Sequence, residues 1–287
     1  MGFFDRIFNR PSPSLPFPVE AKIRSYLQAK CIPIRNGYKW RYEEINCSHP
    51  GLNGTSFLEI WTEPLSAFQY VTMQQRMSVS SNNVNDTAAG TGAWKLWLLG
   101  LDENYLEIDE TIDLNGTTPV LTRKRWIRIN RAIVTDSGNP EGLLGTISII
   151  PETQTGRVQG RILPGDNVLE KSHYTVPDNH VAVVMVLSGE LVTKAQTLNV
   201  SAEVKLCASN GQHFELTGTT TAPTSYSPFT RLASLTANRF SPSRGGDVVQ
   251  LVCPRSDFHV CAKMAENPVA GVPYLGRYLM WVVDLSR

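Results

Sequence analysis

The chain has 287 residues, of which 41% are hydrophobic and 18% are charged, and its formal net charge at pH 7 is +1. This balance gives no general basis for binding phosphate backbones, no apolar run reaches the roughly 18 residues of a membrane-spanning helix, and the N-terminus does not resemble a secretory signal. We therefore expect neither nucleic-acid binding nor a helical membrane protein, and the length allows two domains or one large β domain.

Residues 1–40 predict an N-terminal arm with a short helix. Its first ten residues place apolar side chains on one helical face, and prolines from Pro11 onward would end that helix. These apolar side chains are Phe3, Phe4, Ile7 and Phe8. We expect this assembly arm to dock on its own or a neighbouring subunit, and the alternative is contact with a membrane or another partner. A weaker amphipathic pattern covers residues 19–32.

From Gly37 onward, short strand patterns alternate with turn residues. Candidate strands in the first half are 57–61, 68–80, 93–99, 105–114, 117–122, 126–134, 145–150 and 157–163. Those in the second half are 173–176, 181–187, 197–207, 212–216, 229–235, 247–253, 259–264 and 274–285. We predict an all-β chain of two tandem β-sandwich modules of jelly-roll type, at residues 41–165 and 166–287. No residue-level repeat relates them, so any duplication would be structural only.

The segment from Asp86 to Val134 carries the densest run of strand and turn signals. Gly90-Thr91-Gly92 joins two strand patterns, which favours a tight inter-strand loop over a phosphate-binding loop that opens a helix. Asn115-Gly116 has the residues preferred in a type I′ turn, so we expect a hairpin at this position.

Charged residues flank this expected turn. Strand 105–114 alternates apolar and acidic side chains, but Glu110 falls on the apolar face, which predicts an edge, a bulge or a buried pairing. A two-residue turn would place Glu107 opposite Lys124. We predict that aromatic and charged side chains of this segment contact neighbouring subunits. The subunit-contact candidates are Trp94, Trp97, Glu107, Asp109, Arg123, Lys124 and Arg125.

The sequence shows no catalytic, cofactor-binding or metal-binding constellation. The five histidines lack the close spacings typical of zinc sites, and the five cysteines form no CxxC pair. Cys253 and Cys261 could face each other across a hairpin, but their spacing leaves the pairing open. The six tryptophans could form a sugar-stacking platform or could pack in the core and at interfaces. We therefore predict a protein that is not an enzyme and uses no cofactor or metal.

Several motifs resemble a β module of bacteriophage virion proteins, particularly those of phages from aquatic environments. In the first half they are Asp86-Thr-Ala-Ala-Gly-Thr-Gly-Ala93, Gly100-Leu-Asp102, Asn104-Tyr105, Glu107-Ile108, Glu110-Thr111, Leu114-Asn-Gly-Thr-Thr-Pro-Val120 and Arg128-Ile-Asn-Arg131. In the second half they are Tyr174-Thr-Val-Pro177, Ser188-Gly-Glu190 and Ala202-Glu-Val-Lys-Leu206. The chain departs from this pattern at Trp94-Lys-Leu-Trp97, where relatives tend to carry small and β-branched residues. The resemblance implies a virion component and no catalytic residues.

The resemblance and the predicted fold favour a self-assembling capsid or head-surface building block. We expect homotrimers or higher assemblies that also contact other virion proteins, located in virions assembled in the host cytoplasm. Two alternatives stay open. One is a phage tail or fibre adaptor that binds a receptor, and the other is a glycan-binding β-sandwich protein.

Overall fold

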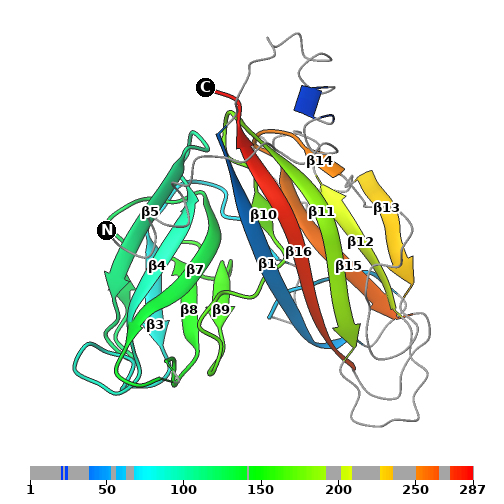
Figure 1. Ribbon diagram of the computed structural model, residues 1–287. Coiled ribbons are helices and arrows are strands. Elements are labelled where there is room, and N and C mark those ends of the chain that lie inside the picture. The colour runs from blue at the N-terminus through cyan, green and yellow to red at the C-terminus, as the bar shows by residue number, and fades with distance from the viewer. Residues whose placement is uncertain are drawn as a thin grey trace.

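The structure is a computed structural model. It describes residues 21, 23–24, 39–52, 56–62, 68–140, 142–191, 202–208, 227–234, 250–264 and 272–286. Within these residues the regular secondary structure is almost entirely β-strand, and the strands form four antiparallel sheets. Figure 1 shows two stacks of strands lying side by side. The predicted all-β sandwich fold is confirmed.

The first stack is a sandwich formed by β3 to β9. The bounds are Met77–Ser81 for β3, Ala93–Leu101 for β4, Glu107–Asp113 for β5, Val120–Leu121 for β6, Arg128–Ser137 for β7, Ile147–Pro151 for β8 and Gly160–Ile162 for β9. One sheet has the order β6-β3-β8-β9 and the other has the order β5-β4-β7. Apolar side chains such as Val79, Leu98 and Trp126 fill the core between the two sheets.

The second stack contains β1, β2 and β10 to β16. The bounds are Lys39–Leu52 for β1, Leu58–Glu59 for β2, Tyr174–Thr175 for β10, His180–Leu191 for β11, Ala202–Ala208 for β12, Ser227–Ser234 for β13, Gln250–Val252 for β14, Asp257–Met264 for β15 and Val272–Asp284 for β16. One sheet has the order β1-β16-β11-β14, and the other has the order β10-β15-β12-β13 with β2 also paired to β15. Ile45, Phe258 and Tyr278 belong to the core between them.

A short helical segment covers part of the outer face of the β1-β16-β11-β14 sheet. Ala21, Ile23 and Arg24 are helical, in agreement with the pattern over residues 19–32. The side chain of Ile23 is buried in a small cluster with the apolar side chains of that outer face. The cluster contains Ile23, Val181, Val183 and Val283. The predicted assembly arm of Phe3, Phe4, Ile7 and Phe8 lies outside the described residues.

The second sandwich has the strand order of a complete jelly roll. In that fold eight antiparallel strands form two sheets, and successive strands change sheet except at one hairpin. Here the chain alternates between the sheets from β1 to β16, and the β12–β13 hairpin stays within one sheet. The position of the second jelly-roll strand is shared by β2 and β10, which both pair antiparallel with β15.

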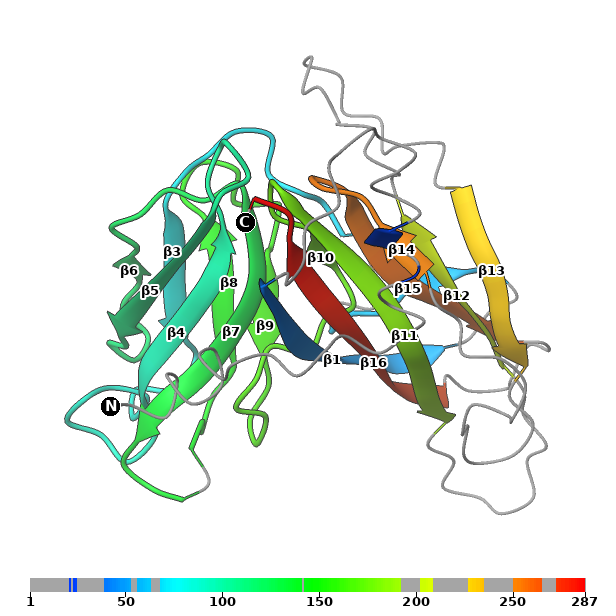
Figure 2. The same ribbon diagram turned by 45° about the horizontal axis from the view of Figure 1, so that its top comes forward.

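The first sandwich is inserted in the middle of that shared strand. Along β15, Glu59 of β2 pairs with Cys261, and Tyr174 of β10 pairs with Phe258 in the same direction. Between these two points the chain leaves at Trp61 and returns at Lys171, and these two residues form an antiparallel bridge. Both views show the inserted sandwich beside the sheet that contains β10 and β15 (Figures 1 and 2).

The two sandwiches share one strand order but differ in where the chain enters it. In the first sandwich, residues 167–169 run along the free edge of β7, where Val134 N–H bonds to Asn167 O and Leu169 N–H to Ala132 O. With this segment added, its sheets match those of the second sandwich strand for strand. The first sandwich is therefore a circularly permuted form of the same topology. The two sandwiches share this topology although their sequences show no repeat.

The pairing of β1 and β2 differs from the tandem order that we expected. Both lie within residues 41–165, but β1 pairs with β16 and β2 pairs with β15. We predicted no strand at β1, because two of its inward-facing side chains, Glu43 and His49, are polar and hide the apolar alternation. Glu43 is buried beside Arg41 and the hydroxyl of Tyr174, which explains how the core accepts it.

The expected hairpin at Asn115-Gly116 is wrong. β5 pairs with β4, whereas β6 pairs with β3 in the opposite sheet, so the chain crosses between sheets at this point. Gly116 has a φ of +58°, but Asn115 is not among the residues with positive φ, as a type I′ turn would require. Gly116 N–H instead donates to Asp86 O, and Ser81 N–H donates to Gly116 O.

The Asp86 carboxylate is the buried centre around which the loops at one end of the first sandwich are folded. It is fully buried and accepts hydrogen bonds from one side chain and three backbone N–H groups. These donors are Ser81 Oγ at 2.5 Å, Ala93 N at 2.9 Å, Leu144 N at 3.1 Å and Gly145 N at 2.9 Å. A Cβ at Gly92 would lie 2.1 Å from Asp86 Oδ1. The glycine loop therefore encloses a carboxylate of its own chain, as expected for an inter-strand loop.

Replacing Asp86 by alanine should destabilise the protein by about 3 kcal/mol or more, because several buried donors would lose a charged acceptor. Urea unfolding followed by fluorescence would measure the change. Asp113→Ala is the matched control, since the Asp113 side chain is 77% exposed and faces only Lys95. An equal loss of stability in both variants would contradict this role for Asp86.

Candidate functional site

A group of buried polar side chains lies where the inserted sandwich joins the second sandwich. Along β15, Phe258 and Val260 point into the core, so by alternation Asp257 and His259 face the opposite side. On the adjoining strand pieces, Glu59 and His173 occupy the same outer side. The pairing of β2 and β10 with β15 thus brings together residues that are far apart in sequence.

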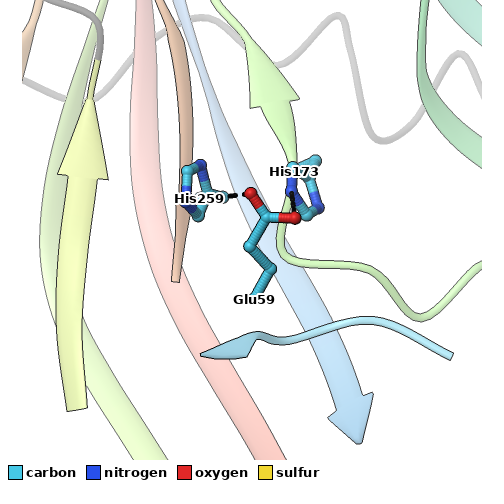
Figure 3. Close-up of side chains that lie close together, drawn as sticks. All are labelled: Glu59, His173 and His259. Atoms are coloured by element: carbon cyan, nitrogen blue, oxygen red, sulfur yellow. Dashed lines mark ion pairs between the residues drawn. The ribbon is translucent and has the colours of Figure 1, made fainter. Parts of the chain in front are cut away.

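Glu59 lies between two histidines (Figure 3). Its Oε2 atom is 3.6 Å from His173 Nε2, and its Oε1 atom is 3.7 Å from His259 Nε2. The two imidazole rings are stacked, with centroids 4.8 Å apart and planes inclined by 19°. Both histidines are buried, whereas 23% of the Glu59 side chain is exposed. We refer to Glu59, His173 and His259 as the junction triad.

Aromatic rings close one side of the junction triad. Phe68 stacks on His173 with ring centroids 4.2 Å apart, and its N–H donates to Glu59 Oε2 over 2.6 Å. Trp61 meets Phe68 edge-on at 5.2 Å. The residues at which the chain enters the inserted sandwich therefore also orient the carboxylate and cover the imidazole.

The protonation states of the triad follow from burial and from the charges around it. Burial lowers the pKa of His173 to about 4, although Glu59 acts in the opposite direction. Burial alone would raise the pKa of Glu59, but its contacts with the histidines and with Phe68 N–H outweigh burial and lower it to about 2. At neutral pH the triad thus presents an ionised carboxylate and a neutral His173 imidazole.

A buried lysine lies next to the triad. The side chain of Lys171 is buried, its Nζ donates to Gln159 O over 3.0 Å, and it lies 4.7 Å from the centre of the Phe68 ring. Burial and the charge of Arg128 lower the pKa of Lys171 to about 7, against the opposing influence of Asp257. This ammonium group can therefore lose its proton near neutral pH.

A buried ion pair links the two sandwiches beside Lys171. Arg128 of β7 donates to both oxygens of Asp257, from Nε over 3.0 Å and from Nη2 over 3.1 Å. The Tyr70 ring covers the guanidinium at 4.2 Å, and the Thr175 hydroxyl donates to Asp257 Oδ1 over 2.5 Å. Burial opposes the charge of Arg128, but Asp257 raises the pKa of the guanidinium overall. Arg128 therefore stays charged at all relevant pH values.

Two further polar contacts hold the sandwiches together. Asn130 of β7 exchanges two hydrogen bonds with the backbone of Thr175, from Nδ2 to the carbonyl over 2.8 Å and from the N–H to Oδ1 over 2.9 Å. Arg41 of β1 binds both carboxylate oxygens of Glu107 in β5. The junction is thus specified by directional polar contacts on both sides.

The junction triad has the chemistry of a metal-binding group. Neutral imidazole nitrogens and a carboxylate oxygen are common ligands of divalent transition metals. Sequence spacing did not reveal it, since Glu59, His173 and His259 come from three distant segments. Only the splitting of one strand by the insertion brings the first two side by side.

The predicted subunit-contact candidates lie in the first sandwich, away from the triad. Trp97 is buried and its Nε1 donates to Asp109 Oδ2, while Trp94 Nε1 donates to Gly90 O. Both indoles therefore have polar partners within their own chain. Glu107 is engaged by Arg41 across the junction and not by Lys124 as we expected.

Glu110 explains the break in alternation that the sequence shows. Its side chain is buried, and its two oxygens accept the backbone N–H groups of Arg123 and Lys124, each over 2.9 Å. This is the predicted buried pairing. The side chains of Arg123, Lys124 and Arg125 are exposed, and Lys124 Nζ lies beside Asp109. Arg123 is also paired with Glu110 through its Nε atom, and Asp109 accepts from Trp97 Nε1.

The cysteines form no bridge in the described part of the chain. Cys47, Cys253 and Cys261 are not in a disulfide bond. Cys253 follows β14 and Cys261 lies in β15, which belong to opposite sheets. The pairing of Cys253 with Cys261 that the sequence left open is therefore not formed.

Lys171→Met should stabilise the protein relative to wild type more at about pH 6 than at about pH 9. The folded-state pKa of Lys171 is lowered from 10.5 to about 7, so its burial costs most below pH 7 and progressively less as pH rises towards 10.5. Thermal unfolding of both proteins across this range would show the trend. Lys95→Met, at a half-exposed position, should show no such pH dependence. A constant difference at all pH values would contradict the prediction.

Asp257→Ala should cost about 3–5 kcal/mol of unfolding free energy, because it leaves the buried guanidinium of Arg128 without its carboxylate. The double variant Arg128→Met/Asp257→Ala should recover part of that loss in a double-mutant cycle. The Arg76–Glu152 pair is the control, since both side chains are partly exposed. Glu152→Ala should cost no more than about 1 kcal/mol. Strictly additive losses at Arg128 and Asp257 would contradict the coupling.

None of the helices in the described part of the chain is long and apolar enough to cross a membrane.

No protein-family profile matches the chain, and no curated protein matches it. Among solved structures, the chain has weak similarity to particles of infectious bursal disease virus. A structure of the Gt strain is 10% identical with a TM-score of 0.15, over 94% of this chain and 81% of that chain. A T=1 particle derived from the virus is 13% identical with a TM-score of 0.16, over 91% and 74%. A VP2 subviral particle is 10% identical with a TM-score of 0.14, over 91% and 80%. At these TM-scores the similarity carries no argument about function.

Proposed function

We propose that the protein is a non-enzymatic virion structural protein, a capsid or head-surface building block that assembles with copies of itself and with other virion proteins. The assembly unit is a homotrimer or a higher assembly, and its place is the virion.

The observation that carries this proposal is the nested jelly-roll architecture. A jelly roll with a complete set of strands carries a second, permuted jelly roll inserted in one of its strands. Jelly rolls recur in viral capsid proteins, lectins and cupins. A second lobe held directly by a strand of the first gives one compact two-lobed block, which suits repeated packing in a particle. The resemblance of residues 86–134 to phage virion modules supports the same reading.

The placement of the tryptophans argues against the glycan-binding alternative. Trp61, Trp97 and Trp126 are buried, so their faces are not open to a sugar ring. Trp94 is partly buried and bonded to Gly90 O. Four of the six tryptophans are therefore wholly or partly used for packing within the chain, as in the packing alternative that the sequence left open.

The exposed basic run offers a surface for subunit contact. Arg123, Lys124 and Arg125 follow one another beside the partly exposed Asp109. Complementary charges at such a surface set orientation and association rate in protein interfaces. Since the backbone of this run is fixed by the buried Glu110, its side chains project from a defined position.

Mass photometry and electron microscopy of the purified full-length chain test the proposal. We expect trimers or larger closed particles, and a chain that stays monomeric at all accessible concentrations would overturn the proposal. Arg125→Glu should weaken association by about tenfold or more, since one reversed charge at an interface costs several kcal/mol. Its thermal stability should match wild type, because Arg125 is exposed. Lys95→Glu on a neighbouring strand is the control and should assemble normally.

A further inference from the structure

We infer that Glu59, His173 and His259 bind a divalent transition-metal ion, of which zinc is the best fit, at the junction between the two sandwiches. The three donor atoms, one from each side chain, all lie within 4.8 Å of one another. The site would join β2, β10 and β15 where the inserted sandwich leaves and rejoins the strand. Neither the proposed assembly role nor the resemblance to virion modules assigns it.

The distances in the triad are close to those of a bound ion. The two carboxylate-to-imidazole distances are 3.6 and 3.7 Å. Ligand atoms about 2.0–2.2 Å from a tetrahedral zinc ion lie roughly 3.3 Å from one another. These two distances involve different oxygens of Glu59, and the separations among one donor atom per residue reach up to 4.8 Å, so an ion would draw the three side chains closer together. Glu59 can make this adjustment, since its side chain is long and partly exposed.

The orientation of the side chains favours an ion between them. Figure 3 shows the Glu59 carboxylate directed between the rings, with one oxygen towards each histidine. The stacked arrangement of His173 and His259 places both Nε2 atoms on the side of the carboxylate. Phe68 N–H holds Glu59 Oε2, and such outer contacts fix the ligands of metal sites.

A buried ring nitrogen within the site has no hydrogen bond of normal length, since His173 Nε2 lies 3.6 Å from Glu59 Oε2. His173 is almost completely buried, yet neither of its ring nitrogens has a hydrogen-bond partner among the described residues. Buried ring nitrogens normally have such a partner. A metal ion at the position that His173 Nε2 faces would supply it.

The cationic side chains beside the triad have partners of their own. The guanidinium of Arg128 is paired with Asp257, and Lys171 Nζ donates to Gln159 O over 3.0 Å. Both cations therefore have partners other than the Glu59 carboxylate.

The ligand set selects the class of metal. Imidazole nitrogens favour zinc and other transition metals, whereas calcium and magnesium need mostly oxygen ligands. Three protein ligands leave one position for water. Because the ligands come from both sides of the insertion and from β15, the ion would act as a clamp on the junction.

The test uses the purified full-length chain, stripped with a chelator and then titrated with zinc. We expect one zinc ion per chain by mass spectrometry of the metal content, and an increase in melting temperature on zinc addition. Cobalt substitution should give the visible absorption of a four-coordinate site. A wild-type chain that takes up no stoichiometric zinc, or takes it up with no change in melting temperature, would overturn the inference.

Variants separate this site from adventitious binding. Glu59→Gln keeps the shape of the side chain but removes its charge. Mutating a residue that only hydrogen-bonds to a metal ligand typically lowers metal affinity by roughly 10- to 100-fold, so loss of the ligand itself should weaken zinc binding by more than that. His173→Gln should do the same. Glu44→Gln, a carboxylate on an exposed face of β1, is the matched control and should bind zinc as wild type does. Equal zinc affinity in Glu59→Gln and Glu44→Gln would mean adventitious binding and would overturn the inference even if His173→Gln failed to fold.

Discussion

The ion pair between Arg128 and Asp257 fixes how the two sandwiches meet. Both charges are withdrawn from water, and such a pair is tolerable only when its geometry satisfies nearly every donor and acceptor. The bidentate contact, the Thr175 hydroxyl and the Tyr70 ring meet that requirement together. A small rotation of one sandwich would separate the charges without exposing them to solvent. Polar complementarity therefore sets the relative orientation of the lobes.

The strand split by the insertion explains why polar groups gather beside this ion pair. Trp61 and Lys171 must lie next to each other for the strand to resume along β15. Glu59, which precedes the insertion, and His173, which follows it, then become neighbours on the side of the sheet that faces away from the core. The inserted sandwich covers that face, so Glu59 and His173 are enclosed between two lobes. Burial lowers the pKa of His173, whereas contacts with the histidines and with Phe68 N–H lower that of Glu59, and the topology, not a local motif, creates both environments.

The sequence predicted those features that depend on local pattern. β5 and β11 were found because β5 alternates apart from the buried Glu110 and β11 contains an apolar run. β1 was missed, since the polar side chains of Glu43 and His49 face inward, and Glu43 is bonded to the hydroxyl of the distant Tyr174. Asn115-Gly116 suggested a hairpin. However, β5 pairs with β4 and β6 pairs with β3, so the chain crosses from one sheet to the other at this turn. The junction triad could not be predicted from spacing, because its members meet only after the strand order is known.

The chain leaves the first sandwich for the second over a short connection. It runs along residues 167–169 at the free edge of β7. That edge faces β10, so the chain passes into the second sandwich after only a few residues. With the buried ion pair and the hydrogen bonds between Asn130 and Thr175 also joining them, the lobes have little freedom to rotate. A subunit of fixed shape is what repeated contacts between identical copies require, since each contact must recur with the same geometry.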